Sequence, residues 1–265
     1  MSITLITRAD DFGSSRSANR AIAEAAVTGG YIKNVSCMAP APMMEDGAGL
    51  LAGCKHICLG MHFTLSAEWS LIKWPPICDP SDVPGLVTGL GAFPETPAVF
   101  AERIPPMEQV LRELDAQLDF LTRLSLPIRY VDGHMLPEKF IPGLAQAMAE
   151  WADRKGLINH LYYYRFPAQM EPSHCLTLPE GLQALDHWLG LLEDGQYFGA
   201  MHPAIGGREM LLCTNRETPW GLVSAARNVE YEMLRSREPE RLCSQRGISC
   251  VRYDEASPLE HPDSF

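Results

Sequence analysis

The chain lacks three features that would tie it to a membrane, to nucleic acid or to secretion. It has no run of about 18 apolar residues, so we expect no membrane span. Its 22 Lys and Arg are outnumbered by 33 Asp and Glu, and the net charge of -11 argues against binding a phosphate backbone. The N-terminus lacks the basic start and long apolar run of a secretory signal, so we expect a cytoplasmic protein.

The eight cysteines are not spaced as a zinc cassette. No C-x-x-C pair occurs, and Cys54 and Cys58, four residues apart, are followed by no second pair. A chain of 265 residues buries about three quarters of its unfolded surface and needs no disulfides to fold. We therefore expect free thiols at every position, namely Cys37, Cys54, Cys58, Cys78, Cys175, Cys213, Cys243 and Cys250.

Short apolar runs alternate with longer periodic ones along most of the chain. The apolar runs predict strands at 3–7, 32–38, 57–65, 128–132, 159–163, 197–201 and 248–253. Helices are predicted between them, one beginning at Ser14 or Ser15, the others at 43–51, 107–124, 142–155, 179–193 and 219–236. This alternation predicts an α/β fold, a TIM-barrel-like (β/α) barrel with about seven parallel strands. An open doubly wound sheet is the alternative.

We expect a single domain over residues 1–265, with an irregular loop insertion at about 66–106 that is rich in Pro and Gly. Trp69 and Trp74 in this loop are candidates for an apolar platform under a sugar. The alternative is that they pack the loop onto the barrel or onto a second subunit, which would make the protein a homodimer. Arg165 follows the fifth predicted strand and is a further candidate for contact with substrate.

Aspartate and histidine side chains follow four of the predicted strands. These residues are Asp10, Asp11, His62, Asp132, His134 and His202. The carboxyl ends of parallel strands meet at one rim, where such folds place their sites. Two imidazoles and one carboxylate can bind a divalent metal such as Zn²⁺ and leave room for water. A second carboxylate can take the proton of that water, and a further His can protonate a leaving group.

Each of these residues also has a purely structural interpretation. Asp10 and Asp11 suit a turn or a helix cap, His62 a hydrogen-bonded core position, and His134 a loop. The His202-Pro203 pair suits the end of a strand. All of these structural interpretations would have to hold together at one end of the sheet, so we favour the metal site.

Four segments in order resemble motifs of one family. They are Arg8–Gly13 (R-A-D-D-F-G), Gly60–Leu65 (G-M-H-F-T-L), Tyr130–His134 (Y-V-D-G-H) and Met201–Ala204 (M-H-P-A). Their sequences, order and rough spacing resemble those of the YdjC-like carbohydrate deacetylases, which include the chitooligosaccharide deacetylases. The resemblance extends from Ile3 to Tyr253. It implies a TIM-barrel-like fold, a divalent ion (Mg²⁺ or Zn²⁺), and hydrolysis of an N-acetyl group from an amino sugar to give an amine and acetate.

The resemblance also implies a role for each matched residue. Asp11, His62 and His134 would ligate the metal, Asp10 would be the general base, and His202 the general acid or oxyanion stabiliser. Asp132, within the third motif, is a candidate for contact with substrate.

The chain departs from the family pattern at two positions. Leu136 stands where many members carry a second His, which leaves a chitooligosaccharide substrate unassigned, and Ala204 replaces a common Gly.

Two other functions remain open at this point. Another metal-dependent barrel enzyme, such as an amidohydrolase, isomerase or phosphoesterase, would use similar residues. A phosphoesterase is the less favoured of these because only Arg8 and Arg165 lie beside predicted strand ends. A non-catalytic sugar-binding homologue is disfavoured because a binding protein has no use for both Asp10 and His202.

Overall fold

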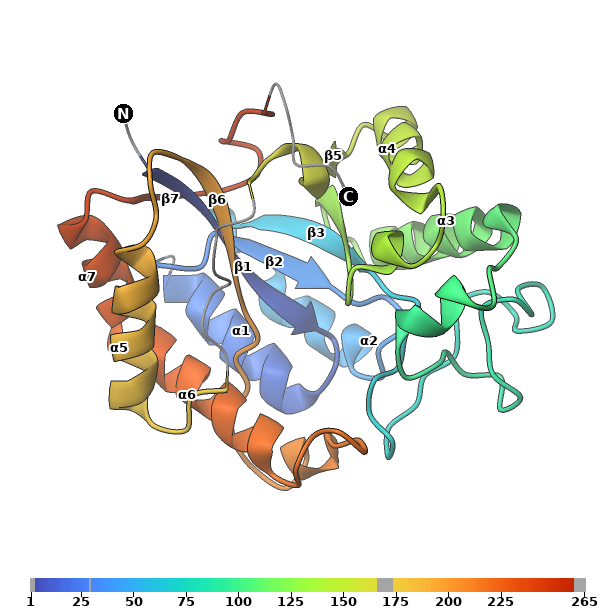
Figure 1. Cartoon of the computed structure of the whole chain (residues 1–265), viewed down its shortest axis with the longest axis horizontal. Helices are drawn as coiled ribbons and strands as arrows, with labels where there is room; N and C mark the ends of the chain where they lie inside the picture. The colour runs from blue at the N-terminus through green and yellow to red at the C-terminus, as the bar shows by residue number, and fades with distance from the viewer. Residues whose placement is uncertain (1–2, 29, 166–173, 260–265) are drawn as a thin grey trace.

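The centre of the molecule is a curved parallel sheet (Figure 1). The computed structural model describes residues 3–28, 30–165 and 174–259, and within them seven strands pair in the order β5-β4-β3-β2-β1-β6, with β7 also on β1. The strands are β1 (Ile3–Phe12), β2 (Asn34–Cys37), β3 (Cys58–Phe63), β4 (Ile128–Gly133), β5 (Ile158–Asn159), β6 (Gly195–Met201) and β7 (Ser249–Val251).

All strand pairs in this sheet are parallel, which confirms the predicted fold class. Along one side of β1 lies β6, and along the other side lie first β7 and then β2. A bridge between Arg165 and Tyr197 joins the segment after β5 to the edge strand β6, with the Arg165 N–H donating to the Gln196 oxygen at 3.0 Å. The sheet therefore curves into a half-barrel, and the carboxyl ends of its parallel strands lie at one rim.

Helices cover the outside of the sheet. They are α1 (Arg16–Thr28), α2 (Met44–Ala48), α3 (Met107–Arg123), α4 (Leu144–Lys155), α5 (Leu178–Leu189), α6 (Leu222–Ser236) and α7 (Glu238–Gln245). In Figure 1, α1, α5, α6 and α7 gather on one side and α3 and α4 on the other. Among the described residues, no helix combines the length and apolar character needed to cross a bilayer.

The two faces of the strands carry different side chains, because successive residues point to opposite sides. Leu5, Val35 and Met61 belong to the main apolar core with the helices. Ile6 is the neighbour of Leu5 and points to the opposite face, where it forms a second cluster with Tyr130 inside the half-barrel. Polar residues of this second set follow toward the carboxyl ends of the strands, so the inner face changes from apolar to charged as it approaches the rim.

Most predicted elements are present, with shifted ends. Ser15 caps α1 as expected, since its Oγ accepts from the Ala18 N–H at 2.9 Å. The predicted strand 159–163 is wrong beyond Asn159, where the chain turns into a short 3-10 helix (His160–Tyr162). The α7 helix was not predicted; Arg237 in a left-handed conformation (φ 62°) separates it from α6.

The predicted irregular stretch at 66–106 contains one short 3-10 helix (Pro97–Ala101) and otherwise no helix or strand. None of the eight cysteines, which all lie within the described residues, is in a disulfide.

Candidate metal centre

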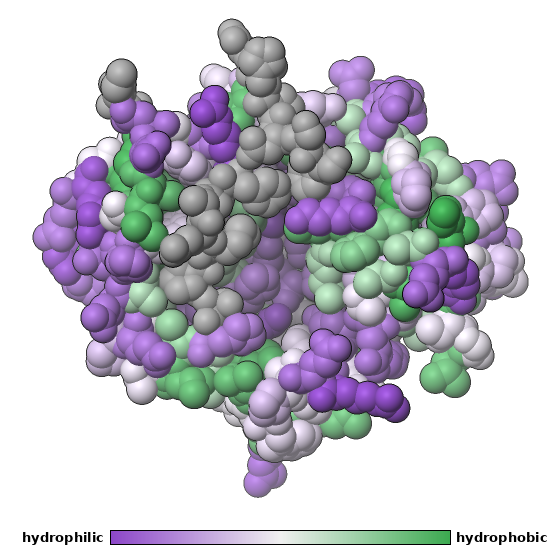
Figure 2. Space-filling model, viewed as in Figure 1, coloured by the Kyte–Doolittle hydropathy of each residue, from purple (hydrophilic) through white to green (hydrophobic). Residues whose placement is uncertain are grey.

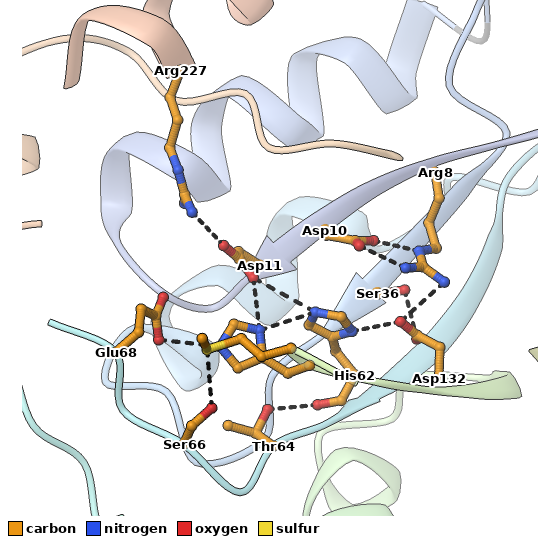
Figure 3. Close-up of polar contacts among 12 residues, drawn as sticks. Arg8, Asp10, Asp11, Ser36, His62, Thr64, Ser66, Glu68, Asp132 and Arg227 are labelled. Carbon is orange, nitrogen blue, oxygen red and sulfur yellow. Dashed lines mark hydrogen bonds and ion pairs between the residues drawn. The ribbon is translucent and has the colours of Figure 1, made fainter. Parts of the chain in front are cut away.

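A bulge at the end of β1 brings two consecutive aspartates into the same site. The pairing register between β1 and β2 shifts between Ala9 and Phe12, and Asp11 adopts a left-handed φ of 65°. In a regular strand the Asp10 and Asp11 side chains would point to opposite faces. The bulge instead turns Asp11 toward the imidazoles of His62 and His134, while Asp10 stays on the inner face beside Arg8 (Figure 3).

Three ligand atoms from β1, β3 and the end of β4 form a small triangle. Asp11 Oδ1 lies 3.3 Å from His134 Nδ1 and 3.6 Å from His62 Nε2, and the two nitrogens are 3.2 Å apart. An ion at the centre of such a triangle is about 2 Å from each atom, which is the length of zinc–nitrogen and zinc–oxygen bonds. Asp11 Oδ1 is buried without a hydrogen-bond partner. The three residues therefore fit a divalent ion.

Carboxylates fix the orientation of both imidazoles. Asp132 Oδ2 lies 2.6 Å from His62 Nδ1, and Glu68 Oε2 lies 3.1 Å from His134 Nε2. Because an ionised carboxylate only accepts hydrogen bonds, these outer nitrogens donate. When deprotonated, the inner nitrogens have lone pairs directed at the triangle. Such carboxylate–histidine pairs are typical of metal ligands.

Arg8 connects the two inner carboxylates. Its Nη2 lies 2.7 Å from Asp10 Oδ2, and its Nη1 lies 3.0 Å from Asp132 Oδ2. Ser36 Oγ donates to the other Asp132 oxygen at 2.9 Å. Burial opposes the ionisation of Asp132, but the charges of Arg8 and His62 hold its pKa well below the usual range. Asp132 therefore remains an acceptor for His62.

The charges around Asp11 and His134 favour their ionised forms. Burial opposes the ionisation of Asp11, yet Arg227, with Nη2 2.7 Å from Asp11 Oδ2, and His134 hold its pKa well below the usual range. Burial also lowers the pKa of His134, but the charges of Glu68 and Asp11 outweigh this and raise it to about 10. Without an ion, the site therefore keeps a proton.

A pocket of about 200 Å³ adjoins this centre through Arg227, which belongs to both. It is lined by Trp69, His174, His202, Val223, Ala226, Arg227 and Glu230. The His202 backbone N–H donates to Glu230, a carboxyl group whose pKa is raised by burial. Figure 2 shows a hollow lined by hydrophilic residues in the region where Figure 1 shows the carboxyl end of β1.

The structure separates the four residues that the sequence suggested for substrate contact. Trp69 lines the pocket beside His202. Trp74 is buried, and its Nε1–H donates to the Ser66 oxygen at 3.0 Å. Asp132 is fully buried behind His62, and Arg165 is exposed next to the edge of β6.

Comparison with known proteins identifies the family. The family model described as YdjC-like protein matches residues 4–245. The chain belongs to the YdjC-like family. The resemblance seen in the four motifs is thereby confirmed.

Named relatives of this YdjC-like chain match parts of it. A chitooligosaccharide deacetylase of Enterobacter sp. (strain 638) is 31% identical over 176 residues, which are 66% of this chain and 63% of that protein. A carbohydrate deacetylase of Geobacillus stearothermophilus is 33% identical over 130 residues, 49% of this chain and 48% of the relative. The matched region thus spans about half to two thirds of the length of these relatives.

Solved structures share the fold of the YdjC-like chain. A protein of Enterococcus faecalis V583 named for cellobiose-phosphate cleavage superposes with a TM-score of 0.76 at 20% identity, covering 96% of this chain and 99% of the other. The catalytic domain of a peptidoglycan N-acetylglucosamine deacetylase from Eubacterium rectale ATCC 33656 gives 0.52 at 8% identity, covering 98% and 92%. At these identities the likeness concerns the fold alone.

Two residues of the YdjC-like centre were not found by sequence reasoning. Glu68 lies in the loop after β3, and Arg227 lies in the middle of α6. Neither follows a strand directly, so the rule that selected the aspartates and histidines passed them over. The one signal for Glu68 was a carboxylate six residues after His62 in a stretch with no other charged residue.

Proposed function

We propose that this protein is a metal-dependent hydrolase that removes the N-acetyl group from an N-acetylated amino sugar or oligosaccharide. The observation that carries the proposal is the buried Asp11 oxygen, which has no hydrogen-bond partner and faces the inner nitrogens of His62 and His134. The deacetylase names of the relatives supply the substrate class. The free thiols fit a reaction in the cytoplasm.

Asp11, His62 and His134 would hold the ion, with Zn²⁺ or Mg²⁺ as the candidates. When bound, such an ion supplies a Lewis acid for the acetyl carbonyl and makes water more acidic. The Asp132 and Glu68 carboxylates keep both imidazoles in the orientation that this requires.

Asp10 is our candidate for the general base. Arg8 donates hydrogen bonds to its carboxylate. Possible metal-ligand atoms of Asp10, His62 and Asp132 lie within 4.8 Å of one another. Each Asp10 oxygen that accepts from Arg8 retains a second lone pair, so the carboxylate can take a proton from water. The hydroxide unit joins the acyl carbon as the proton passes to Asp10.

His202 is our candidate for the general acid, since it lines the pocket beside the centre. It donates a proton to the amine nitrogen as the carbon–nitrogen bond breaks, which leaves acetate and a free amino sugar. Trp69 lines the same pocket and is the best supported of the four candidates for substrate contact; Trp74, Asp132 and Arg165 lie away from it.

Acetate release tests the proposal directly. Protein loaded with Zn²⁺ or Mg²⁺ is incubated with N-acetylated mono- and oligosaccharides and with matched acetamides and phosphate esters. We expect acetate from the sugars, no phosphate release, and loss of activity in Asp11→Asn. The control is Asp46→Asn, which alters an exposed aspartate paired with Arg16. Folded, metal-loaded protein that releases no acetate from any N-acetyl sugar would overturn the proposal.

A further inference from the structure

The two oxygens of the Asp11 carboxylate have different surroundings. Oδ2 accepts from Arg227 Nη2 at 2.7 Å. Oδ1 has no hydrogen-bond partner and faces His62 and His134 at 3.6 and 3.3 Å. Figure 3 shows Arg227 reaching Asp11 from the side opposite His62. One oxygen is therefore occupied by a cationic donor, and the other is left for a ligand.

Arg227 is held firmly enough to impose this division. It lies within α6, its backbone oxygen accepts from the Ala204 N–H at 3.1 Å, and its guanidinium lies 5.7 Å from the centre of the Trp69 ring. The side chain is only 12% exposed. Arg227 thus contacts the segment after β6 through its backbone, and the loop after β3 and the end of β1 through its guanidinium.

We propose that Arg227 is a positioning residue that makes Asp11 a one-oxygen metal ligand. By holding Oδ2 on the side of Asp11 away from His62, it prevents both oxygens from binding the same ion, so more coordination positions stay open for water and substrate. This rests on the metal site of the proposed function. A site of two imidazoles and one carboxylate oxygen favours Zn²⁺, whereas Ca²⁺ accepts both oxygens of a carboxylate readily. Arg227 should therefore also affect which ion the protein prefers.

The test measures metal binding rather than catalysis. Zn²⁺ and Ca²⁺ are titrated separately into metal-free wild-type protein and into Arg227→Met and Arg227→Lys, with circular dichroism to verify folding. Arg16→Met is the matched control, because Arg16 pairs with Asp46 at 2.8 Å, close to the 2.7 Å of the Arg227–Asp11 pair, but on the surface, with side chains 71% and 55% exposed. Methionine removes the donors while keeping a long side chain, and lysine restores one charged donor.

We expect Arg227→Met to bind Zn²⁺ about 10- to 100-fold more weakly, as for other residues that hold a metal ligand in place. Because the freed Oδ2 can then also bind the ion, the affinity of this variant for Ca²⁺ should fall less than its affinity for Zn²⁺. The ratio of Zn²⁺ affinity to Ca²⁺ affinity should therefore be lower than in wild type. Arg227→Lys should lie between Arg227→Met and wild type, and Arg16→Met should match wild type. If folded Arg227→Met keeps the wild-type ratio, whether or not both affinities drop, the proposal is wrong.

The outcome can be separated from that of the deacetylase proposal. Wild-type protein that binds Zn²⁺ but releases no acetate would overturn the activity and leave the role of Arg227 standing. Acetate release by wild type, together with an unchanged affinity ratio in Arg227→Met, would overturn the role of Arg227 alone. Wild-type protein that binds no Zn²⁺ would overturn the role of Arg227, and if it also released no acetate with Mg²⁺, both proposals would be wrong.

Discussion

Asp10 and Asp11 are neighbours in the chain, yet their carboxylates have different partners. Arg8 holds Asp10, and Arg227 holds one oxygen of Asp11. We predict that Asp10→Asn lowers kcat about 100- to 10,000-fold, as expected for the loss of a general base, while Zn²⁺ affinity stays near wild type. Steady-state acetate release and a metal titration measure the two quantities. Asp254→Asn, at an exposed pair with Arg252, is the control, and a parallel loss of metal affinity would assign Asp10 to the metal instead.

Protonation of His134 should make metal binding depend on pH. Its pKa of about 10 means that the metal-free site carries a proton at neutral pH, and an ion at Nδ1 must displace it. Apparent Zn²⁺ affinity should therefore rise with pH by about tenfold per unit until the pKa is reached. Competition with a chromophoric chelator between about pH 6.5 and about pH 8.5 measures this slope.

Glu68→Gln provides the control for the pH effect. The Glu68 charge is the largest of the influences that raise the pKa of His134, so its removal should flatten the pH dependence. An equally steep dependence in this variant would show that another group releases the proton.

At the residue scale, the sequence could predict those site residues that directly follow a strand. His62, Asp132 and His134 lie at strand ends that any parallel sheet brings together, so their convergence was predictable. The partners Glu68 and Arg227 come from a loop and from a helix, whose positions depend on tertiary packing. The left-handed conformation of Asp11 was equally hidden, because a non-glycine residue rarely adopts it and no local pattern announces it.

At the scale of the elements, the missing side chain of Gly60 in β3 leaves the space that the Tyr130 ring of β4 fills. A Cβ at Gly60 would lie 2.2 Å from the ring of Tyr130, its partner in the neighbouring strand. The ring cannot move easily, since Tyr130 is fully buried and its hydroxyl lies 2.8 Å from Ser36 Oγ. We predict that Gly60→Ala lowers the free energy of unfolding by about 1–3 kcal/mol through overpacking.

Urea denaturation measures that change, and Gly49→Ala is the matched control. Gly49 has nothing within 4 Å of its Cβ position and a φ of -63° that alanine adopts freely. This variant should be unchanged or stabilised by up to about 1 kcal/mol. Equal stability of the two variants would mean that the Tyr130 ring yields without cost.

The helices were predictable in proportion to their periodicity. In α3, Val110, Leu114 and Leu121 are fully buried, as the spacing of its apolar residues predicted. The α7 helix has only eight residues, so its apolar pattern is too short to stand out. The two-residue β5 ends where the chain must leave the sheet, and its aromatic continuation suggested a longer strand. The bounds of such short elements depend on tertiary contacts, which the local sequence pattern does not show.

At the scale of the whole molecule, the site holds together segments distant in the chain. The three candidate ligands are residues 11, 62 and 134, and Arg227 adds a fourth segment from α6. An ion that binds the folded but not the unfolded chain stabilises the fold by mass action. Zn²⁺ at about 100 times its dissociation constant should add about 2.7 kcal/mol, or about 5–10 °C in Tm for a chain of this size.

Thermal denaturation of metal-free protein at increasing Zn²⁺ measures this shift, and a chelator should reverse it. Asp11→Asn separates the site from weaker surface binding, because it removes the negative oxygen at the triangle and leaves the exposed carboxylates intact. The shift should largely disappear in this variant. If Asp11→Asn is stabilised as much as wild type, the ion binds elsewhere, and the convergence of these four segments serves packing rather than metal binding.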